Sequence, residues 1–315
     1  MTRFQPPDVL VLGGGGILGE AWMTAVIAGL EETTSFDARA CEGYVGTSAG
    51  SIVAAVLAAG VDPRSRLGQL PQQPAVSPTE VPGERGPLTR ALGIGLALGG
   101  TAAAPLAVLS LRSTEAGGAL LRRVALGRVP AGRRSLAHMG REIDRAGARW
   151  DGRLLVSAVE LESGHRVMFG APGAPEASVG TAVEASCAIP GVFRPIAVGG
   201  RRYVDGGAWS PTNTDRAPAH RGTRVLCLNP TGSMRPSRAT PFGAIGLLSR
   251  SLAAVEAVAL ERRGARVTTV NPDAGSLAAM GPNLMDAGPR ARVIAAGLTQ
   301  GRALGRPVAR ASRAG

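Results

Sequence analysis

The chain has 315 residues, 44% of them hydrophobic, which is enough for one large α/β domain with a substantial core. Its formal net charge is +12 and all 35 basic residues are arginines, so long-range attraction favours anionic partners. Five phenylalanines, three tryptophans and two tyrosines offer little surface for stacking on bases, and we expect no nucleic-acid partner. Three widely spaced cysteines without a C-x-x-C pair indicate neither a disulfide framework nor a zinc site.

The N-terminal segment predicts a strand over residues 8–12, a glycine-rich loop over residues 13–19 and a helix over residues 17–31. Residues 1–7 lack the apolar stretch of a signal peptide, so we expect a cytoplasmic protein. A glycine-rich loop such as residues 13–19 presents backbone N–H groups that bind a phosphate or an oxyanion. Gly14, Gly16 and Gly19 also satisfy a dinucleotide-binding fingerprint, with Asp37 at the spacing of a ribose-binding acid.

A second strand is predicted over residues 43–46 and a second helix over residues 50–60, with Gly46-Thr47-Ser48-Ala49-Gly50 between them. This G-x-S-x-G pattern is typical of a nucleophile elbow, in which a sharp turn exposes the serine hydroxyl. The small residues around Ser48 allow the chain to bend tightly, and the helix that follows adds its N-terminal dipole. Ser48 is therefore a candidate nucleophile.

Residues 62–87 contain six prolines among polar residues, which predicts an exposed insertion rather than a regular element. The uncharged run 91–111 approaches the length of a membrane span, but Gly99, Gly100 and Pro105 interrupt it. We expect these residues to form a pair of helices that covers the active site or dips into lipid. The alternative is a buried helical hairpin that makes no contact with lipid. Residues 287–315 carry six arginines and no acidic residue, and we expect a disordered basic tail over 305–315.

The remainder predicts further alternation of helices and strands, and therefore an α/β fold with a mixed central sheet. A hairpin is expected over 153–159 and 166–169, because a turn-forming Glu162-Ser163-Gly164 segment separates two apolar runs. The other expected strands cover 202–204, 223–228 and 265–270, and the other expected helices cover 135–148, 177–187, 242–263 and 290–304.

A third motif, Asp205-Gly206-Gly207, follows the strand expected at 202–204. A glycine loop after one strand, a serine elbow after the next and a DGG at a later strand end form the ordered set of patatin-like phospholipases. The chain resembles that family from about residue 8 to residue 229, including the stretch 185–196 ahead of the DGG.

The resemblance implies a three-layer α/β/α fold, built here as one domain over residues 1–304 with residues 62–112 as an insertion or lid. It also implies a serine acyl hydrolase of lipid esters that needs no cofactor or metal. Ser48 would be the nucleophile and Asp205 the general base and acid of a Ser–Asp dyad. The amides of Gly14, Gly15 and Gly16 would form the oxyanion hole. The supporting motif glycines would be Gly19, Gly46, Gly50, Gly206 and Gly207.

The chain departs from the family pattern at Leu18, where a cation is usual. Arg194 or Arg202 could supply a positive charge from elsewhere. The order Ser48, Asp205, His220 also matches an α/β-hydrolase triad, although His220 lies in a polar loop typical of a surface histidine.

Two other functions stay open at this point. One is an oxidoreductase that binds a dinucleotide through Gly14, Gly16 and Gly19. The other is a non-catalytic lipid-binding protein on the same fold, which Leu18 and the basic tail would suit. Whether the protein hydrolyses lipids or only binds them, residues 91–111 and the arginine-rich C-terminus are candidates for peripheral contact with an anionic membrane.

Overall fold

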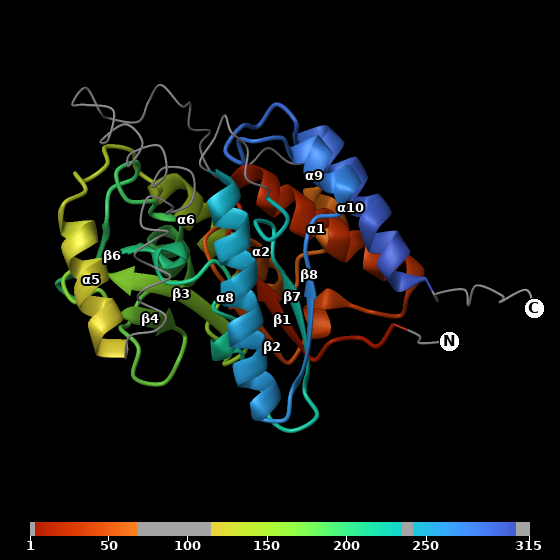
Figure 1. Ribbon diagram of the computed structural model, residues 1–315, viewed down its shortest axis with the longest axis horizontal. Helices are drawn as coiled ribbons and strands as arrows, with labels where there is room; N and C mark the ends of the chain where they lie inside the picture. The colour runs from red at the N-terminus through yellow and green to blue at the C-terminus, as the bar shows by residue number, and fades with distance from the viewer. Residues whose placement is uncertain (1–3, 69–114, 235–241, 307–315) are drawn as a thin grey trace, which may run out of the picture.

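The computed structural model describes residues 4–68, 115–234 and 242–306. One mixed sheet of eight strands organises this part of the chain (Figure 1), in the hydrogen-bonded order β5-β6-β3-β2-β1-β7-β8, with β4 paired to β3. Its strands are β1 (Val9–Leu12), β2 (Gly43–Gly46), β3 (Leu154–Glu160), β4 (Arg166–Phe169), β5 (Ile196–Val198), β6 (Arg201–Asp205), β7 (Arg224–Leu228) and β8 (Arg266–Val270). The pairs among β3, β2, β1, β7 and β8 are parallel, whereas β4, β5 and β6 pair antiparallel.

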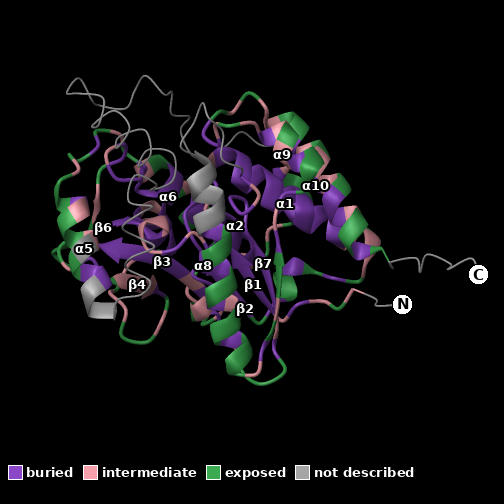
Figure 2. Ribbon diagram, in the orientation of Figure 1, coloured by how far each residue is buried: buried purple, intermediate pink, exposed green. Residues whose placement is uncertain are grey.

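Helices cover both faces of the sheet, which gives the expected three layers. The described helices of at least seven residues are α1 (Gly16–Thr33), α2 (Ala49–Ala58), α5 (Glu115–Gly127), α6 (Ala137–Arg145), α7 (Val179–Cys187), α8 (Phe242–Arg262), α9 (Ala274–Met280) and α10 (Arg290–Gly305). Short 3₁₀ turns include η2 (Pro63–Arg66), η4 (Gly206–Ala208) and η5 (Thr214–Arg216). Figure 2 shows the central strands and the inner helix faces buried, and exposed residues on the outer face of α8.

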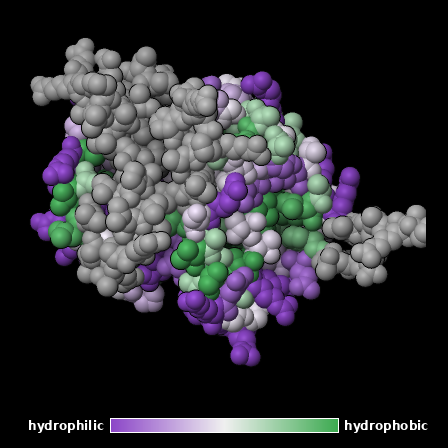
Figure 3. All heavy atoms as spheres, viewed as in Figure 1, coloured by the Kyte–Doolittle hydropathy of each residue, from purple (hydrophilic) through white to green (hydrophobic). Residues whose placement is uncertain are grey.

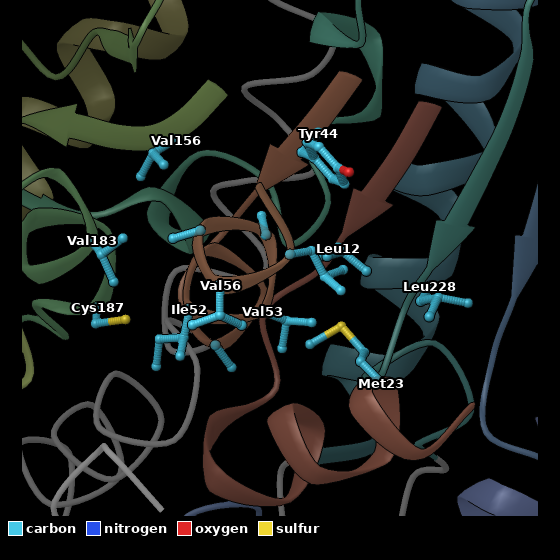
Figure 4. Close-up of a cluster of buried hydrophobic side chains, with 14 of the residues drawn as sticks. Leu12, Met23, Tyr44, Ile52, Val53, Val56, Val156, Val183, Cys187 and Leu228 are labelled. Atoms are coloured by element: carbon cyan, nitrogen blue, oxygen red, sulfur yellow. The ribbon is translucent and has the colours of Figure 1, made fainter. Parts of the chain in front are cut away.

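Side chains of the central strands alternate between the two faces, as the period of a β-strand requires. Leu10, Leu12 and Tyr44 belong to the larger core cluster with α1 and α2, whereas Val9, Val11 and Val45 pack in a second cluster with Leu260 of α8. Figure 4 shows the larger core around α2. Ile52, Val53 and Val56 lie between Leu12 and Met23 on one side and Val183 and Cys187 on the other. Helix α2 is therefore packed between buried side chains on two sides.

The register of β3 explains how two motifs far apart in sequence meet. Val156 pairs with Phe169 of β4 and with Gly46 of β2, while Ala158 pairs with β4 and with Asp205 of β6. A strand has only two edges, so β2 and β6 share the edge of β3 opposite β4. They run in opposite directions, and their carboxyl ends face each other across Ser157. The serine elbow and the DGG motif therefore meet at this point.

The expected strands and helices that fall on described residues are confirmed to within a few residues. Helices α5 and α9 and the short strand β5 were not predicted from the sequence. The uncharged run 91–111, most of the expected insertion 62–112 and the tail from residue 307 lie outside the described residues, so the domain boundaries stay predictions. Within the described ranges, no helix combines the length and the apolar character needed to cross a bilayer.

The visible surface mixes hydrophilic and hydrophobic residues (Figure 3). Among the exposed large aliphatic side chains are Leu120 and Val124 on α5 and Val255 and Val258 on α8.

Candidate active site

Ser48 occupies a strained turn between β2 and α2. Its backbone has φ 50° and ψ −123°, a conformation that costs a non-glycine residue free energy and is found mainly where a function requires it. Gly46 and Gly50 make the turn possible. A Cβ on Gly50 would lie 1.9 Å from the Leu12 carbonyl oxygen, and a Cβ on Gly46 would lie 2.4 Å from Ser51 Cα. Both glycines of the elbow are therefore steric requirements.

The Ser48 hydroxyl donates a hydrogen bond to Asp205 Oδ2 at 2.7 Å. Both residues are 6% exposed, so the pair is largely shielded from solvent. The Gly207 N–H donates to the other carboxylate oxygen, Asp205 Oδ1, at 2.7 Å and holds the carboxylate in this orientation. A Cβ on Gly206 would lie 2.2 Å from Ser157 Oγ, so the first glycine of the DGG allows the close approach to β3.

Burial raises the pKa of Asp205 from 3.8 to about 6, against the opposing effect of its hydrogen bonds from Ser48 and Gly207. The carboxylate is still mostly ionised at neutral pH. It therefore combines the charge state of a base with a proton affinity well above that of an exposed aspartate, which suits proton transfer near neutral pH.

The glycine loop lies directly beside the candidate nucleophile Ser48, since a Cβ on Gly14 would lie 3.5 Å from Ser48 Cβ. The Gly14 N–H, however, donates to the Pro211 carbonyl oxygen at 2.8 Å and is engaged in this conformation. No acceptor within the described part of the chain takes a hydrogen bond from the Gly15 or Gly16 N–H. Of the three predicted oxyanion donors, these two have unoccupied N–H groups.

Gly15 and Gly16 are confined by tight packing. A Cβ on Gly15 would lie 2.6 Å from Pro230 Cβ, and Gly16 has φ 58° with Leu284 and Met285 against it. A Cβ on Gly19 would lie 3.1 Å from Pro230 Cβ, so the first turn of α1 also packs closely on Pro230. These contacts fix the direction of the amides before any substrate binds.

Sequence reasoning missed two further groups at the site. The Ala49 N–H, at the start of α2, donates to no acceptor among the described residues, and the residue after a nucleophile commonly supplies an oxyanion donor. Ser186 Oγ accepts a hydrogen bond from the Ser48 N–H at 2.8 Å and so supports the strained turn. The only signal for Ser186 was its place in the family-like stretch 185–196.

The other residues singled out by the sequence lie away from the dyad. Leu18 is fully buried in the larger core and its N–H donates to the Leu284 carbonyl, so this position does not present its side chain to the site. Arg202 pairs with Glu162 at 2.7 Å, and Arg194 donates to the Arg133 carbonyl. His220 is exposed, and its Nδ1 contacts Thr223 Oγ1 at 3.1 Å.

The serine elbow, the glycine loop and the DGG together have the arrangement expected of the resemblance, and a family comparison agrees. The model of the patatin-like phospholipases matches residues 10–73 and 118–218. The chain belongs to the patatin-like phospholipase family. This family consists of lipid hydrolases, and the matched residues include Ser48, Asp205 and all the motif glycines. Membership therefore favours a lipid hydrolase over the dinucleotide-binding alternative.

Two solved structures are similar to the chain. VipD from Legionella pneumophila is 14% identical, with a TM-score of 0.45, and the similarity covers 96% of the present patatin-like chain and 67% of VipD. The type III effector protein ExoU is 15% identical, with a TM-score of 0.37, and the similarity covers 97% of the present chain and 54% of ExoU. The patatin-like chain thus spans little more than half of ExoU. No curated protein sequence is significantly similar to it.

Asp37, the acidic residue of the dinucleotide-binding alternative, is engaged by a neighbouring arginine. The Asp37 carboxylate is paired with Arg39, its Oδ1 accepting from Arg39 Nε at 2.8 Å and from the Arg39 N–H at 3.0 Å. Within the described residues, no group of three or more histidine, cysteine, aspartate or glutamate side chains is arranged to hold a metal ion.

Proposed function

We propose that the protein is a serine acyl hydrolase that cleaves carboxylic esters of lipids through a Ser48–Asp205 dyad. The observation that carries the proposal is the 2.7 Å hydrogen bond from Ser48 Oγ to Asp205 Oδ2 in a buried elbow. Membership of a phospholipase family supports lipid as the substrate class.

In the proposed mechanism, Ser48 Oγ attacks the ester carbonyl carbon while its proton passes to Asp205. The carbonyl oxygen becomes an oxyanion, for which the N–H groups of Gly15, Gly16 and Ala49 are the proposed donors. One such donor typically contributes about 3–4 kcal/mol to transition-state stabilisation. Collapse of the intermediate releases the alcohol, which takes the proton from Asp205, and leaves the acyl group on Ser48.

Deacylation repeats these steps with water. Asp205 accepts a proton from the water that attacks the acyl-enzyme carbonyl, and then returns the proton to Ser48 Oγ as the fatty acid leaves. The dipole of α2, whose first residue follows Ser48, stabilises negative charge on the oxyanion in both halves. This cycle requires neither a histidine nor a cofactor.

The uncharged run 91–111, one part of the proposed membrane contact, lies outside the described residues. Residues 91–111 and the C-terminal arginines are the proposed contact with an anionic membrane, and the net charge of +12 supports it.

Release of fatty acid from phospholipid vesicles and from simple carboxylic esters tests the proposed function. We expect the wild-type chain to hydrolyse at least one ester class and Ser48→Ala to reduce the rate to background. Hydrolysis by Ser48→Ala at the wild-type rate would refute the assignment of the nucleophile. Vesicle binding without hydrolysis of any ester would favour the non-catalytic lipid-binding protein.

A further inference from the structure

Asn213 combines complete burial with an uncommon backbone conformation. It is 0% exposed, and its φ of 52° and ψ of 34° lie in the left-handed region. Among the described residues, Ser48 is the only other non-glycine residue with positive φ. Asparagine tolerates this region better than most residues, but a fully buried example indicates that its side chain is held by specific partners.

The Asn213 amide joins three separate segments. Its Nδ2 donates to Thr47 Oγ1 at 3.0 Å, to Ser157 Oγ at 3.2 Å and to the Ser210 carbonyl oxygen at 2.7 Å. Thr47 is the chain neighbour of Ser48. Ser157 lies on β3 between the residues that pair with the ends of β2 and β6, and Ser210 belongs to the loop that follows the DGG.

The acceptor side of the amide is also occupied. Asn213 Oδ1 accepts from Arg166 Nη1 at 3.0 Å, and Arg166 is held in turn by a bidentate pair with Asp215 at 2.6 and 2.7 Å. The Arg166 side chain is only 4% exposed. These charge-assisted bonds fix the orientation of the amide, so that Nδ2 faces Thr47 and Ser157.

The loop on either side of Asn213 has its own fixed contacts. Glu256 Oε2 accepts from Thr212 Oγ1 at 2.6 Å and from the Thr214 N–H at 2.8 Å. The preceding Pro211 carbonyl accepts the Gly14 N–H, which ties the same loop to the glycine loop. One segment thus contacts the serine elbow, β3 and the glycine loop at once.

We infer that Asn213 is a positioning residue for the hydrolytic reaction, a role that rests on the proposed function of Ser48 and Asp205. Its amide fixes the elbow and the loop after Asp205 to the same point of β3, and thereby sets the distance and angle between Ser48 Oγ and the Asp205 carboxylate. Displacement of reacting groups by about 1 Å costs about 100-fold in rate. Asn213 touches neither the dyad nor the glycine loop amides, so it acts through Thr47 and Ser157.

Asn213→Gly is the direct test, because glycine adopts positive φ without strain and the change removes only the side chain. We expect kcat for ester hydrolysis to fall about 100-fold while KM changes by less than about threefold. Labelling by a fluorophosphonate, which reports the reactivity of Ser48 without deacylation, slows by a similar factor. The acid limb of the pH profile stays near that of the wild type, because burial is the largest cause of the raised pKa of Asp205 and the substitution does not expose this residue.

Gln300→Ala is the matched control. Gln300 is 7% exposed and its amide also makes four hydrogen bonds, with Trp22 Nε1, the Asp273 N–H, Ser276 Oγ and the Asn271 carbonyl. None of these partners bonds to Ser48 or Asp205. We expect Gln300→Ala to lower the thermal midpoint as much as Asn213→Gly does, with kcat unchanged.

Ser157→Ala is the second test variant, for use if Asn213→Gly does not fold. This substitution removes one hydrogen-bond acceptor of the Asn213 amide and little side-chain volume. A fall of about tenfold in kcat at constant KM supports the inference. Wild-type kcat in either folded variant overturns it, as does an equal loss of kcat in Gln300→Ala. If the wild-type protein is neither labelled at Ser48 nor active on esters, the proposed function fails first and the inference fails with it.

Discussion

Replacing Asp205 with asparagine should stabilise the protein while it abolishes the reaction. Burial raises the pKa of Asp205 from 3.8 to about 6, a difference of about two units. At about 1.4 kcal/mol per unit, the ionised carboxylate costs the folded state about 3 kcal/mol relative to its neutral form. Asparagine is neutral and of the same shape, so it removes that cost and can still accept the Gly207 N–H.

The sign of the pH dependence follows from proton linkage. Because the folded-state pKa lies above the unfolded value, the native protein holds the extra proton between about pH 4 and pH 6, and wild-type stability falls as the pH rises through that window. The asparagine variant lacks this loss. The unfolding free energy of Asp205→Asn should therefore equal that of the wild type near pH 4 and exceed it by about 3 kcal/mol above pH 6. This difference corresponds to a rise in thermal midpoint of about 5 °C or more.

Thermal unfolding of both proteins from pH 4 to pH 8, together with ester hydrolysis at pH 7.5, tests this prediction. The loss of the general base should lower kcat by about 10²- to 10⁴-fold. Asp62→Asn is a suitable control, because Asp62 is an exposed turn residue that accepts the Arg64 N–H at 2.8 Å, and the change should leave activity at the wild-type level. An Asp205→Asn protein that is less stable than the wild type at pH 8, or equally active, would refute the reasoning.

Three further predictions follow from the same geometry. The pH profile of kcat/KM should show an acid limb near pH 6, below which the rate falls about tenfold per pH unit as Asp205 becomes protonated. An acid limb near pH 4 would contradict the effect of burial on the pKa of this carboxyl. Gly50→Ala should cost about 4 kcal/mol or more in unfolding free energy, because its Cβ would lie 1.9 Å from the Leu12 carbonyl oxygen. Gly68→Ala, whose Cβ would meet no atom of the described residues within 4 Å, should be near neutral in the same melting experiment. His220→Ala should keep the wild-type kcat, since within the described part of the chain the exposed ring has hydrogen-bond partners in Arg221 and Thr223 and none in Ser48 or Asp205. A loss of about 10³-fold would instead point to a triad.

Much of the fold could be predicted from local patterns in the sequence. The strands β1, β2 and β7 are short apolar runs bounded by turn residues, and the glycine loop and elbow each predict the start of a helix. The missed helix α5 contains two glycines in its first half, and α9 has only seven residues, so neither carries a strong periodic signal. Strand β5 has three residues and exists through its pairing with β6.

The dyad could be named from its motifs, but its geometry could not. The meeting of Ser48 and Asp205 depends on β2 and β6 sharing one edge of β3, a register that no local pattern contains. The same holds for the Gly14 N–H, which a glycine-rich sequence marks as free although Pro211 engages it. Leu18 stood out only by comparison with the family, and burial in the core explains its hydrophobic character.

The proposed function depends most directly on the activation of Ser48 as a nucleophile by Asp205. Intact-mass analysis and peptide mapping after treatment with a fluorophosphonate measure it directly. We predict a single adduct on Ser48 in the wild-type protein, much slower labelling in Asp205→Asn and none in Ser48→Ala. An unmodified wild-type protein that nevertheless hydrolyses esters, or an adduct on another residue with Ser48 unmodified, would contradict the account.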